Sequence, residues 1–362
     1  MDDGVCRRAG AFIKPSLKPK PRQPSLTLQA RIDCVGRREE GPYTFGMDHY
    51  LKILLLALIQ GAAELLPVSS SAHVIVAERL MGLDPSTPQM VFLLVMLHTG
   101  TMFAVLVYFW PRWRAIWRES LKPSEGGYHF LKLVIWATAI TGLVGGFLYV
   151  VIEKILLRRL FGPEAKLEDL FKNMKLIATS LFLVGIFILV AGLLYSKKKP
   201  RPLTGWSATW IGLLQGVCLP FRGFSRSGAT ISLALLQGIP RQRAEDFSFA
   251  LAIGVTPAVI GYSVLKLLKG GNASPVFDQM LPGLVGMVFS FLAGLLALKL
   301  LSAVLEKGRW HYFGYYCVVA ALLMAVAIAT GVLTTPEKPD PETNHVGVVG
   351  GMASSPQRRA AQ

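Results

Sequence analysis

The first candidate for chemistry is a polar segment that interrupts an apolar stretch between residues 51 and 81. Gln60 and Glu64 are four positions apart, so they share one face of a predicted helix. A carboxylate there costs about 3 kcal/mol to place in a membrane, which makes Glu64 a functional candidate. The competing interpretation is a carboxylate that stays neutral or pairs with an arginine for packing.

Hydroxyl groups and an imidazole follow this carboxylate along the chain. After Pro67 come Ser69, Ser70, Ser71 and His73. A hydroxyl beside a histidine can serve as a nucleophile with its base. Serine also caps helices routinely, so we expect at least one of the three to act only as a cap. His73 has its own plain alternative, an interfacial histidine.

A second polar segment interrupts the apolar stretch between residues 206 and 239. It combines arginines, glycines and hydroxyls, namely Arg222, Gly223, Ser225, Arg226, Ser227, Gly228 and Thr230. The planar guanidinium fork binds phosphate oxygens. Glycine lets backbone N–H groups approach such oxygens closely. The alternative is that Arg226 only forms a structural bridge to Glu64.

Together the two segments supply the groups that phosphoryl transfer needs. That reaction depends mainly on positioning the phosphate and neutralising its charge. Glu64 is also the candidate metal ligand, since a carboxylate can hold a divalent cation that bridges a diphosphate.

The composition predicts that most of the chain lies in a membrane. Of its 362 residues, 52% are hydrophobic and only 17% are charged. The apolar residues form runs of about 20, the length that spans the hydrocarbon core as a helix. We expect six spans, at residues 90–110, 130–152, 175–195, 247–268, 281–303 and 313–333.

The two polar segments divide shorter apolar stretches, each of which resembles a helix, a polar break and a second helix. This pattern is typical of a re-entrant hairpin. Shifting the chain by 155 residues aligns Gln60 with Gln215 and Ser70 with Ser225. Three spans separate the hairpins, so the second copy has the opposite orientation. We therefore predict an inverted repeat, with halves 47–195 and 203–333, whose polar tips meet near the midplane.

The basic residues fix the orientation and exclude a nucleic-acid partner. The net charge is +16, but Lys and Arg gather in loops 111–129, 196–205, 240–246 and 304–312, all on one side. By the positive-inside rule that side is cytoplasmic. The four cysteines form no CxxC pair, so no disulfide framework or zinc site is expected. Residues 1–46 are predicted to be a disordered or misassigned extension, and residues 334–362 a polar tail.

At these motifs the chain resembles the undecaprenyl-diphosphate phosphatase family, also called the bacitracin-resistance protein family. The similar segments are 60–64, 67–73 and 223–230, with 245–249 as a fourth, and the resemblance covers about residues 47–333. Two departures stand out. Arg222 stands where the family commonly has proline, and Gln60 replaces the more usual glutamate, which removes one potential metal ligand.

The resemblance implies hydrolysis of undecaprenyl diphosphate to the monophosphate carrier of peptidoglycan assembly. It implies a multi-pass protein of the bacterial plasma (inner) membrane, with a site open to the periplasmic face and a need for Mg²⁺ or Ca²⁺. High activity would confer bacitracin resistance. By position, Glu64 corresponds to the essential acid, Ser70 and His73 to nucleophile and base, and Arg226 to the diphosphate-binding arginine.

Other functions remain to be separated from this one. A transporter or flippase of polyprenyl phosphate lipids would need the same inverted repeat and anion site. The type-2 phosphatidic-acid phosphatases need a histidine soon after Ser225 and Arg226, but the next one is His311. A membrane scaffold would not explain the buried polar tips. The oligomeric state is not fixed by the sequence, and a homodimer is left open.

Overall fold

Helices make up every regular element that the computed structural model describes. The described residues are 47–84, 87–120, 126–161, 173–269 and 280–333. They fall within one structural unit, Phe45–Gln362. The predictions for residues 1–46 and 334–362 lie outside the described ranges.

Six helices in these ranges are long and apolar enough to cross a membrane, which confirms the predicted spans and the all-α polytopic fold. They are α4 (Pro88–Ser120), α5 (Gly126–Val150), α8 (Met174–Tyr195), α11 (Arg241–Lys269), α13 (Met280–Glu306) and α14 (His311–Ala329). Large apolar side chains point outward from them. Leu143, Phe147 and Leu296 are 74%, 67% and 71% exposed, as expected for groups that face lipid rather than water.

Two spans continue further than the apolar runs predicted. α4 passes Pro111 and ends only at Ser120, so Arg112 and Arg114 are helical rather than in a loop. Proline removes a single backbone bond from a long helix, and the polar residues after it extend that helix beyond the apolar layer. α5 continues as the π-helix η1 (Val151–Leu157) and the short α6 (Arg158–Phe161).

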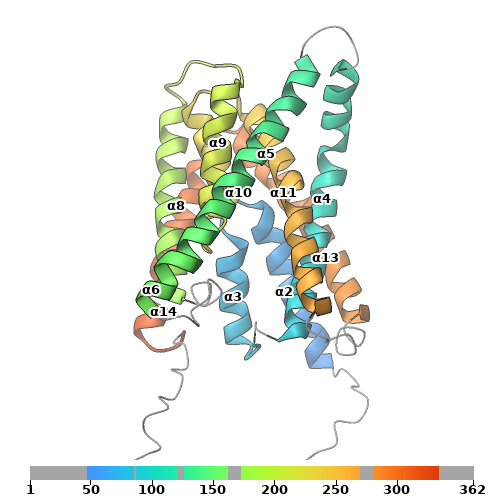
Figure 1. Cartoon of the computed structure of the whole chain (residues 1–362), viewed down its shortest axis with the longest axis vertical. Coiled ribbons are helices and arrows are strands. Elements are labelled where there is room, and N and C mark those ends of the chain that lie inside the picture. The colour runs from blue at the N-terminus through green and yellow to red at the C-terminus, as the bar shows by residue number, and fades with distance from the viewer. Residues whose placement is uncertain (1–46, 85–86, 121–125, 162–172, 270–279, 334–362) are drawn as a thin grey trace, which may run out of the picture. The chain divides into compact units, whose positions relative to one another are not determined.

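The two re-entrant hairpins are formed by pairs of shorter helices. The first pair is α2 (Met47–Leu65) and α3 (Ser70–Leu80), and the second is α9 (Gly205–Cys218) and α10 (Arg226–Leu236). α2 and α9 each end two residues before a proline, because the residue preceding proline disfavours helical backbone. Figure 1 shows α2 and α3 in the lower half of the bundle and α9 in the upper half, so the hairpins enter from opposite ends.

Each hairpin packs against a span from the other half of the repeat. α2 lies against α13, and α9 lies against α5. The aligned glycines Gly61 and Gly216 make these approaches close. A Cβ atom at Gly61 would lie 2.5 Å from the carbonyl oxygen of Ser290, and one at Gly216 would lie 2.7 Å from Cβ of Val144. The matched contacts support the inverted repeat.

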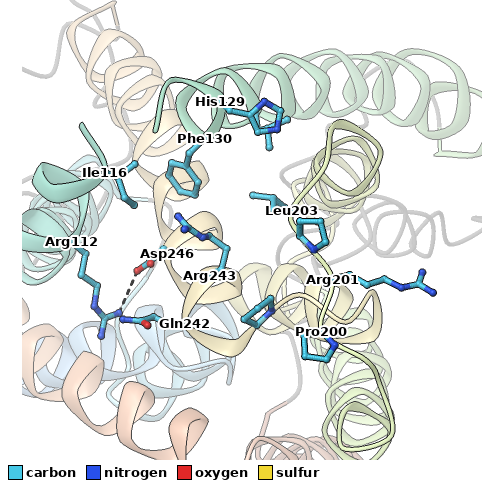
Figure 2. Close-up of a pocket in the computed structure, with 13 residues that line it drawn as sticks. Arg112, Ile116, His129, Phe130, Pro200, Arg201, Leu203, Gln242, Arg243 and Asp246 are labelled. Carbon is cyan, nitrogen blue, oxygen red and sulfur yellow. Dashed lines mark hydrogen bonds and ion pairs between the residues drawn. The ribbon is translucent and has the colours of Figure 1, made fainter. Parts of the chain in front are cut away.

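The end of the bundle where α4 ends and α11 begins is called the basic end here, after its arginines. A buried polar network joins three spans at this end. Arg112 Nη1 lies 2.9 Å from Glu245 Oε2 and 3.3 Å from Asp246 Oδ1. Ser302 on α13 donates to the other oxygen of Glu245. Figure 2 shows Arg112 turned toward Asp246 at the edge of a cavity.

Candidate functional site

The tips of the two hairpins meet through direct polar contacts. Arg226 Nη2 lies 3.2 Å from Glu64 Oε1, an ion pair between residues 162 positions apart. The backbone N–H of Gly223 donates to Ser71 Oγ at 3.1 Å. The structure thus brings together the carboxylate of the first polar segment and an arginine of the second.

Glu64 is the centre of a small group of hydrogen-bond donors. Its Oε2 atom accepts from Gln60 Nε2 at 3.1 Å and from Ser70 Oγ at 2.5 Å. The Gln60 contact confirms that the two residues share a helix face. His98 Nε2 lies 3.6 Å from the same oxygen. The Glu64 side chain is only 15% exposed, so these contacts act in a partly desolvated setting where charge–charge attraction is stronger than in water.

The second tip is shaped by one serine cap and one glycine with a positive φ. Ser225 is the N-cap of α10, and its side chain accepts from the N–H of Gly228 at 3.2 Å. Gly223 has φ 95°, and a Cβ atom there would collide with the carbonyl of Ile177 on α8. Both features make the close turn possible, because only glycine adopts this backbone freely.

Hydroxyl groups hold α10 to the neighbouring span α11. Thr230 Oγ1 lies 2.6 Å from Ser248 Oγ, and Arg226 Nη1 donates to Thr256 Oγ1 at 3.4 Å. Ser227 is buried and lies 3.5 Å from Ser225, oxygen to oxygen. The structure therefore places Thr230 and Ser227 inside the helix packing, whereas Arg226 reaches the gap between the tips.

The first tip leaves the start of α3 without a side-chain cap. Ser69 has φ 68°, a strained value for a residue other than glycine, and makes no capping bond. Its hydroxyl pairs with Ser71 Oγ at 3.3 Å instead. The first N–H groups of α3 are consequently not capped by Ser69, and a helix N-terminus of this kind attracts anions.

His73 does not pair with Ser70, contrary to the arrangement of nucleophile and base implied by the family resemblance. Its Nδ1 lies 2.8 Å from the carbonyl oxygen of Ser69, and its Nε2 lies 2.7 Å from the hydroxyl of Tyr316 on α14. The two rings are also stacked. The Ser70 hydroxyl donates to Glu64 instead, so the carboxylate is its proton acceptor in this state.

Arg222 interacts electrostatically with a carboxylate other than Glu64. Its side chain is exposed, and its charge attracts the buried Glu78 of α3. Three residues that contact the site were not predicted, namely His98, Thr256 and Tyr316. For His98 a signal existed, since an ionisable residue inside a predicted span is a candidate by default.

The cavity at the basic end does not include the tips. It measures about 710 Å³ and is lined by Arg112, Phe130, Arg201, Arg243 and Asp246, among others (Figure 2). Glu64 and Arg226 are not among its lining residues, so this cavity is separate from the site at the tips. A second cavity of about 400 Å³ adjoins His73 and lies between α3, α8 and α14. Its other lining residues are apolar.

The donor set at the tips fits one mode of cation binding and not another. In the described part of the chain no three His, Cys, Asp or Glu residues form a metal-binding group. Glu64 is a single carboxylate whose oxygens face Arg226, Gln60 and Ser70. Mg²⁺ is often bound by one or two carboxylates together with substrate phosphates and waters. The residues therefore suit a cation shared with a bound phosphate group, and not an all-protein cage.

Comparison with known proteins identifies relatives along the whole membrane part. A family model described as bacitracin resistance protein BacA matches residues 53–323, which include both tips. Undecaprenyl-diphosphatase 2 of Acinetobacter baylyi is 51% identical over 275 residues, covering 74% of this chain and 94% of that protein. Undecaprenyl-diphosphatase of Korarchaeum cryptofilum is 35% identical over 274 residues, covering 74% and 95%. The chain therefore belongs to the bacitracin resistance protein BacA family.

Proposed function

We propose that this protein hydrolyses undecaprenyl diphosphate to undecaprenyl phosphate and inorganic phosphate, which recycles the lipid carrier for peptidoglycan synthesis and confers resistance to bacitracin. One observation carries the proposal. A carboxylate from one hairpin, a hydroxyl that donates to it and an arginine from the other hairpin meet inside the membrane protein. The relatives' names supply the substrate.

The diphosphate is held by Arg226 and by the helix starts at the two tips. Arg226 pairs with Glu64 in the empty site, and incoming phosphate oxygens compete for the same guanidinium. The uncapped start of α3 adds N–H groups and the positive end of a helix dipole. Ser225, Ser227, Gly228 and Thr230 keep the start of α10 in place around this arginine.

The isoprenoid chain occupies the apolar cavity that adjoins His73. The walls of this cavity include Val76, Leu181, Leu323, Met324 and Ala327. An apolar lipid chain makes favourable van der Waals contacts with these walls and buries few polar groups there. An apolar cavity beside the phosphate site therefore favours a lipid-linked diphosphate over a water-soluble one.

Ser70 is the nucleophile that the geometry favours. Its Oγ attacks the terminal phosphorus while its proton moves to Glu64 Oε2, the atom it already faces at 2.5 Å. The bond from that phosphorus to the bridging oxygen breaks, and undecaprenyl phosphate leaves. Water then attacks the phosphoserine, the Oγ–P bond breaks, Ser70 Oγ takes back the proton from Glu64, and inorganic phosphate leaves with the oxygen of the water. Departure of Arg226 toward the diphosphate makes Glu64 a better proton acceptor, because a neighbouring positive charge stabilises the carboxylate.

The site would suit a divalent cation, Mg²⁺ or Ca²⁺, that is shared with the bound diphosphate. Glu64 is the residue that would hold it, alongside substrate oxygens. The cation would neutralise charge on the phosphate groups. By the positive-inside rule the basic end is cytoplasmic, so the proposed site opens to the periplasmic face of a bacterial inner membrane.

Phosphate release from purified protein tests the proposal against the transporter alternative. The intact protein in detergent should release inorganic phosphate from undecaprenyl diphosphate, and Ser70→Ala and Arg226→Ala should lose nearly all of this activity. Ser263→Ala is a matched control, because Ser263 is a half-buried serine of α11 whose hydroxyl donates to the carbonyl of Val259 on the same helix. Lipid binding without phosphate release by the intact protein would favour transport.

A further inference from the structure

The cavity at the basic end is a candidate ligand site separate from the tips (Figure 2). It measures about 710 Å³, within the range of about 300–1,000 Å³ that small-molecule sites occupy. Its walls come from four segments, namely the later part of α4, the start of α5, residues 200–203 and the start of α11. A ligand bound there would contact both halves of the inverted repeat.

The cavity lies at the level where three apolar spans end. One span ends at Ile116, the next begins at His129, and a third begins at Arg241. Ile116 and His129 themselves line the cavity, together with the buried side chains of Phe130 and Leu133. This level corresponds to the interfacial layer of a bilayer, where lipid headgroups lie. The apolar walls suit the carbon atoms that follow such a headgroup.

Arginines give the cavity a positive balance of charge. Arg112, Arg201 and Arg243 line it, together with the carboxylate of Asp246. Glu245 shares Arg112 with Asp246, so three arginines face two carboxylates. The segment that carries Arg201 also holds three lysines in a row. Basic pockets between membrane helices on the cytoplasmic side bind phosphate-bearing lipid headgroups.

Arg243 is the residue best placed to bind a phosphate group. The central carbon of its guanidinium lies over the ring of Phe130, 5.5 Å from the ring centre, and Figure 2 shows the side chain extending toward that ring. A cation–π contact consumes no hydrogen-bond donor. Within the described ranges the Arg243 side chain forms no hydrogen bond or salt bridge. Its planar fork is therefore available for phosphate oxygens.

Backbone contacts hold another wall of the cavity in place. The N–H of Arg201 donates to the carbonyl oxygen of Gly238 at 2.9 Å, which joins the segment before α9 to the turn before α11. Gly238 has φ 83°, and a Cβ atom there would lie 2.5 Å from the carbonyl oxygen of Lys199. Three lining prolines stiffen the same two segments. A wall that is already formed reduces the entropy lost when a ligand binds.

We propose that this cavity binds the phosphate headgroup of an anionic phospholipid from the cytoplasmic leaflet. Arg243 binds the phosphate oxygens, and the start of α11, whose first turn has no acidic residue, adds the positive end of a helix dipole. The exposed Arg201 attracts the anion from outside. The glycerol and the first acyl carbons lie against Phe130 and Leu133. The bound lipid joins α4 and α5 of one half to α11 of the other.

The same arginine could meet a phosphate from a second source, free inorganic phosphate. A free phosphate would leave the apolar walls of the cavity uncovered, whereas a lipid covers them and gains contact area. The cavity walls therefore favour the lipid. This assignment does not depend on the proposed hydrolysis, because the cavity does not include Glu64 or Arg226.

Titration of lipid into the intact, detergent-purified protein tests the site. Native mass spectrometry should show one phosphatidylglycerol bound about tenfold more tightly than phosphatidylcholine. Arg243→Gln should weaken phosphatidylglycerol binding about tenfold or more, since a charged hydrogen bond to phosphate is lost. Gln242→Glu keeps the size of a lining side chain and adds a negative charge at the start of α11. That charge suits the helix but repels phosphate, so we expect a similar loss in a folded protein.

Arg309→Gln is the matched control for both variants. It changes the net charge by the same amount at an exposed position in a basic loop, and Arg309 does not line the cavity. It should bind phosphatidylglycerol as the wild type does. Wild-type binding by Arg243→Gln and Gln242→Glu would overturn the proposal. An equal loss in Arg309→Gln would also overturn it, because the attraction would then belong to the whole basic end.

Thermal unfolding of the intact protein separates the two sources of phosphate. A ligand that binds only the folded state raises the unfolding temperature. Phosphatidylglycerol should raise it by about 2 °C or more, whereas phosphatidylcholine and inorganic phosphate at the same concentration should not. Equal stabilisation by inorganic phosphate would assign the cavity to a soluble anion and reject the lipid.

Discussion

At the level of single residues, the site depends on how Glu64 shares its two oxygens. One oxygen faces Arg226 from the other hairpin, and the other accepts from Gln60 and Ser70 of its own hairpin. In the proposed mechanism this ion pair connects substrate binding to chemistry. When phosphate oxygens bind the guanidinium of Arg226, Glu64 would lose a positive partner at the step in which it accepts a proton.

Replacing Arg226 by lysine tests whether the planar guanidinium group, rather than the positive charge alone, is needed for binding the diphosphate. Lysine keeps the positive charge but cannot bind two oxygens in one plane. We expect kcat/KM for undecaprenyl diphosphate to fall about tenfold to a hundredfold, mostly through KM, given about 1.5–3 kcal/mol for a charged hydrogen bond. Steady-state phosphate release measures this. An unchanged KM would show that Arg226 does not bind the diphosphate.

At the level of elements, each hairpin places its tip by a break that its own sequence determines. α2 and α9 end ahead of a proline, and the second turn is completed by Gly223 in a left-handed conformation against α8. Neighbouring helices α3 and α14 then form the wall of the apolar cavity. The breaks position the polar groups, and α3 and α14 contribute to the surface proposed for the lipid chain.

The turn at Gly223 should tolerate no side chain. Gly223→Ala combines strain at φ 95° with a collision against Ile177, which should cost about 1–3 kcal/mol of stability and displace Arg226. Thermal unfolding in detergent and phosphate release measure the two effects. Gly142→Ala is the matched control, since a Cβ there meets nothing within 4 Å. Equal unfolding temperatures and equal phosphate release for the two variants would show that the turn accepts a side chain at Gly223.

Filling the apolar cavity should raise KM more for long-chain substrates than for short-chain ones. Ala327→Trp places a large ring in the cavity, so KM for undecaprenyl diphosphate should rise about tenfold, whereas a short-chain isoprenyl diphosphate should be affected less. Ala325→Trp, on the exposed face of the same helix, is the control. If both substrates respond equally to Ala327→Trp, the chain does not occupy this cavity.

At the level of the whole molecule, two similar halves form one asymmetric site. At the offset of 155 residues, Glu64 aligns with Leu219, and Arg226 aligns with Ser71. The carboxylate thus belongs to one half and the arginine to the other. The halves are also joined at the basic end, where Arg112 of α4 binds Glu245 and Asp246 of α11. The site requires that both halves keep their relative position.

Replacing Arg112 should weaken the contact between α4 and α11 at the basic end. Arg112→Gln leaves two buried carboxylates without their cation, and breaking a buried ion pair costs about 3 kcal/mol or more. We expect a lower unfolding temperature in detergent together with reduced activity, although Arg112 is remote from the phosphate site. Arg114→Gln removes the same charge at an exposed position of α4 and should leave the unfolding temperature and the activity nearly unchanged. A stable Arg112→Gln protein would show that the network is dispensable.

The sequence by itself determined the features that depend on neighbouring residues. Runs of apolar residues set the six spans, and Pro67 and Pro220 set the two breaks. The pairing of Gln60 with Glu64 followed from a spacing of four. The meeting of Glu64 with Arg226 was within reach because the inverted repeat aligned the hairpins. Family resemblance supplied the reaction, which local patterns alone leave open between hydrolysis and transport.

Only the tertiary structure decided which groups face each other across separate helices. His98 turns toward Glu64, and Tyr316 turns toward His73, so the hydroxyl of Ser70 is left with the carboxylate and not with the expected imidazole. These contacts depend on the rotation and depth of α4 and α14 against the hairpins. Packing between side chains that are far apart in the chain fixes that rotation, so it cannot be predicted from the local periodicity of the sequence.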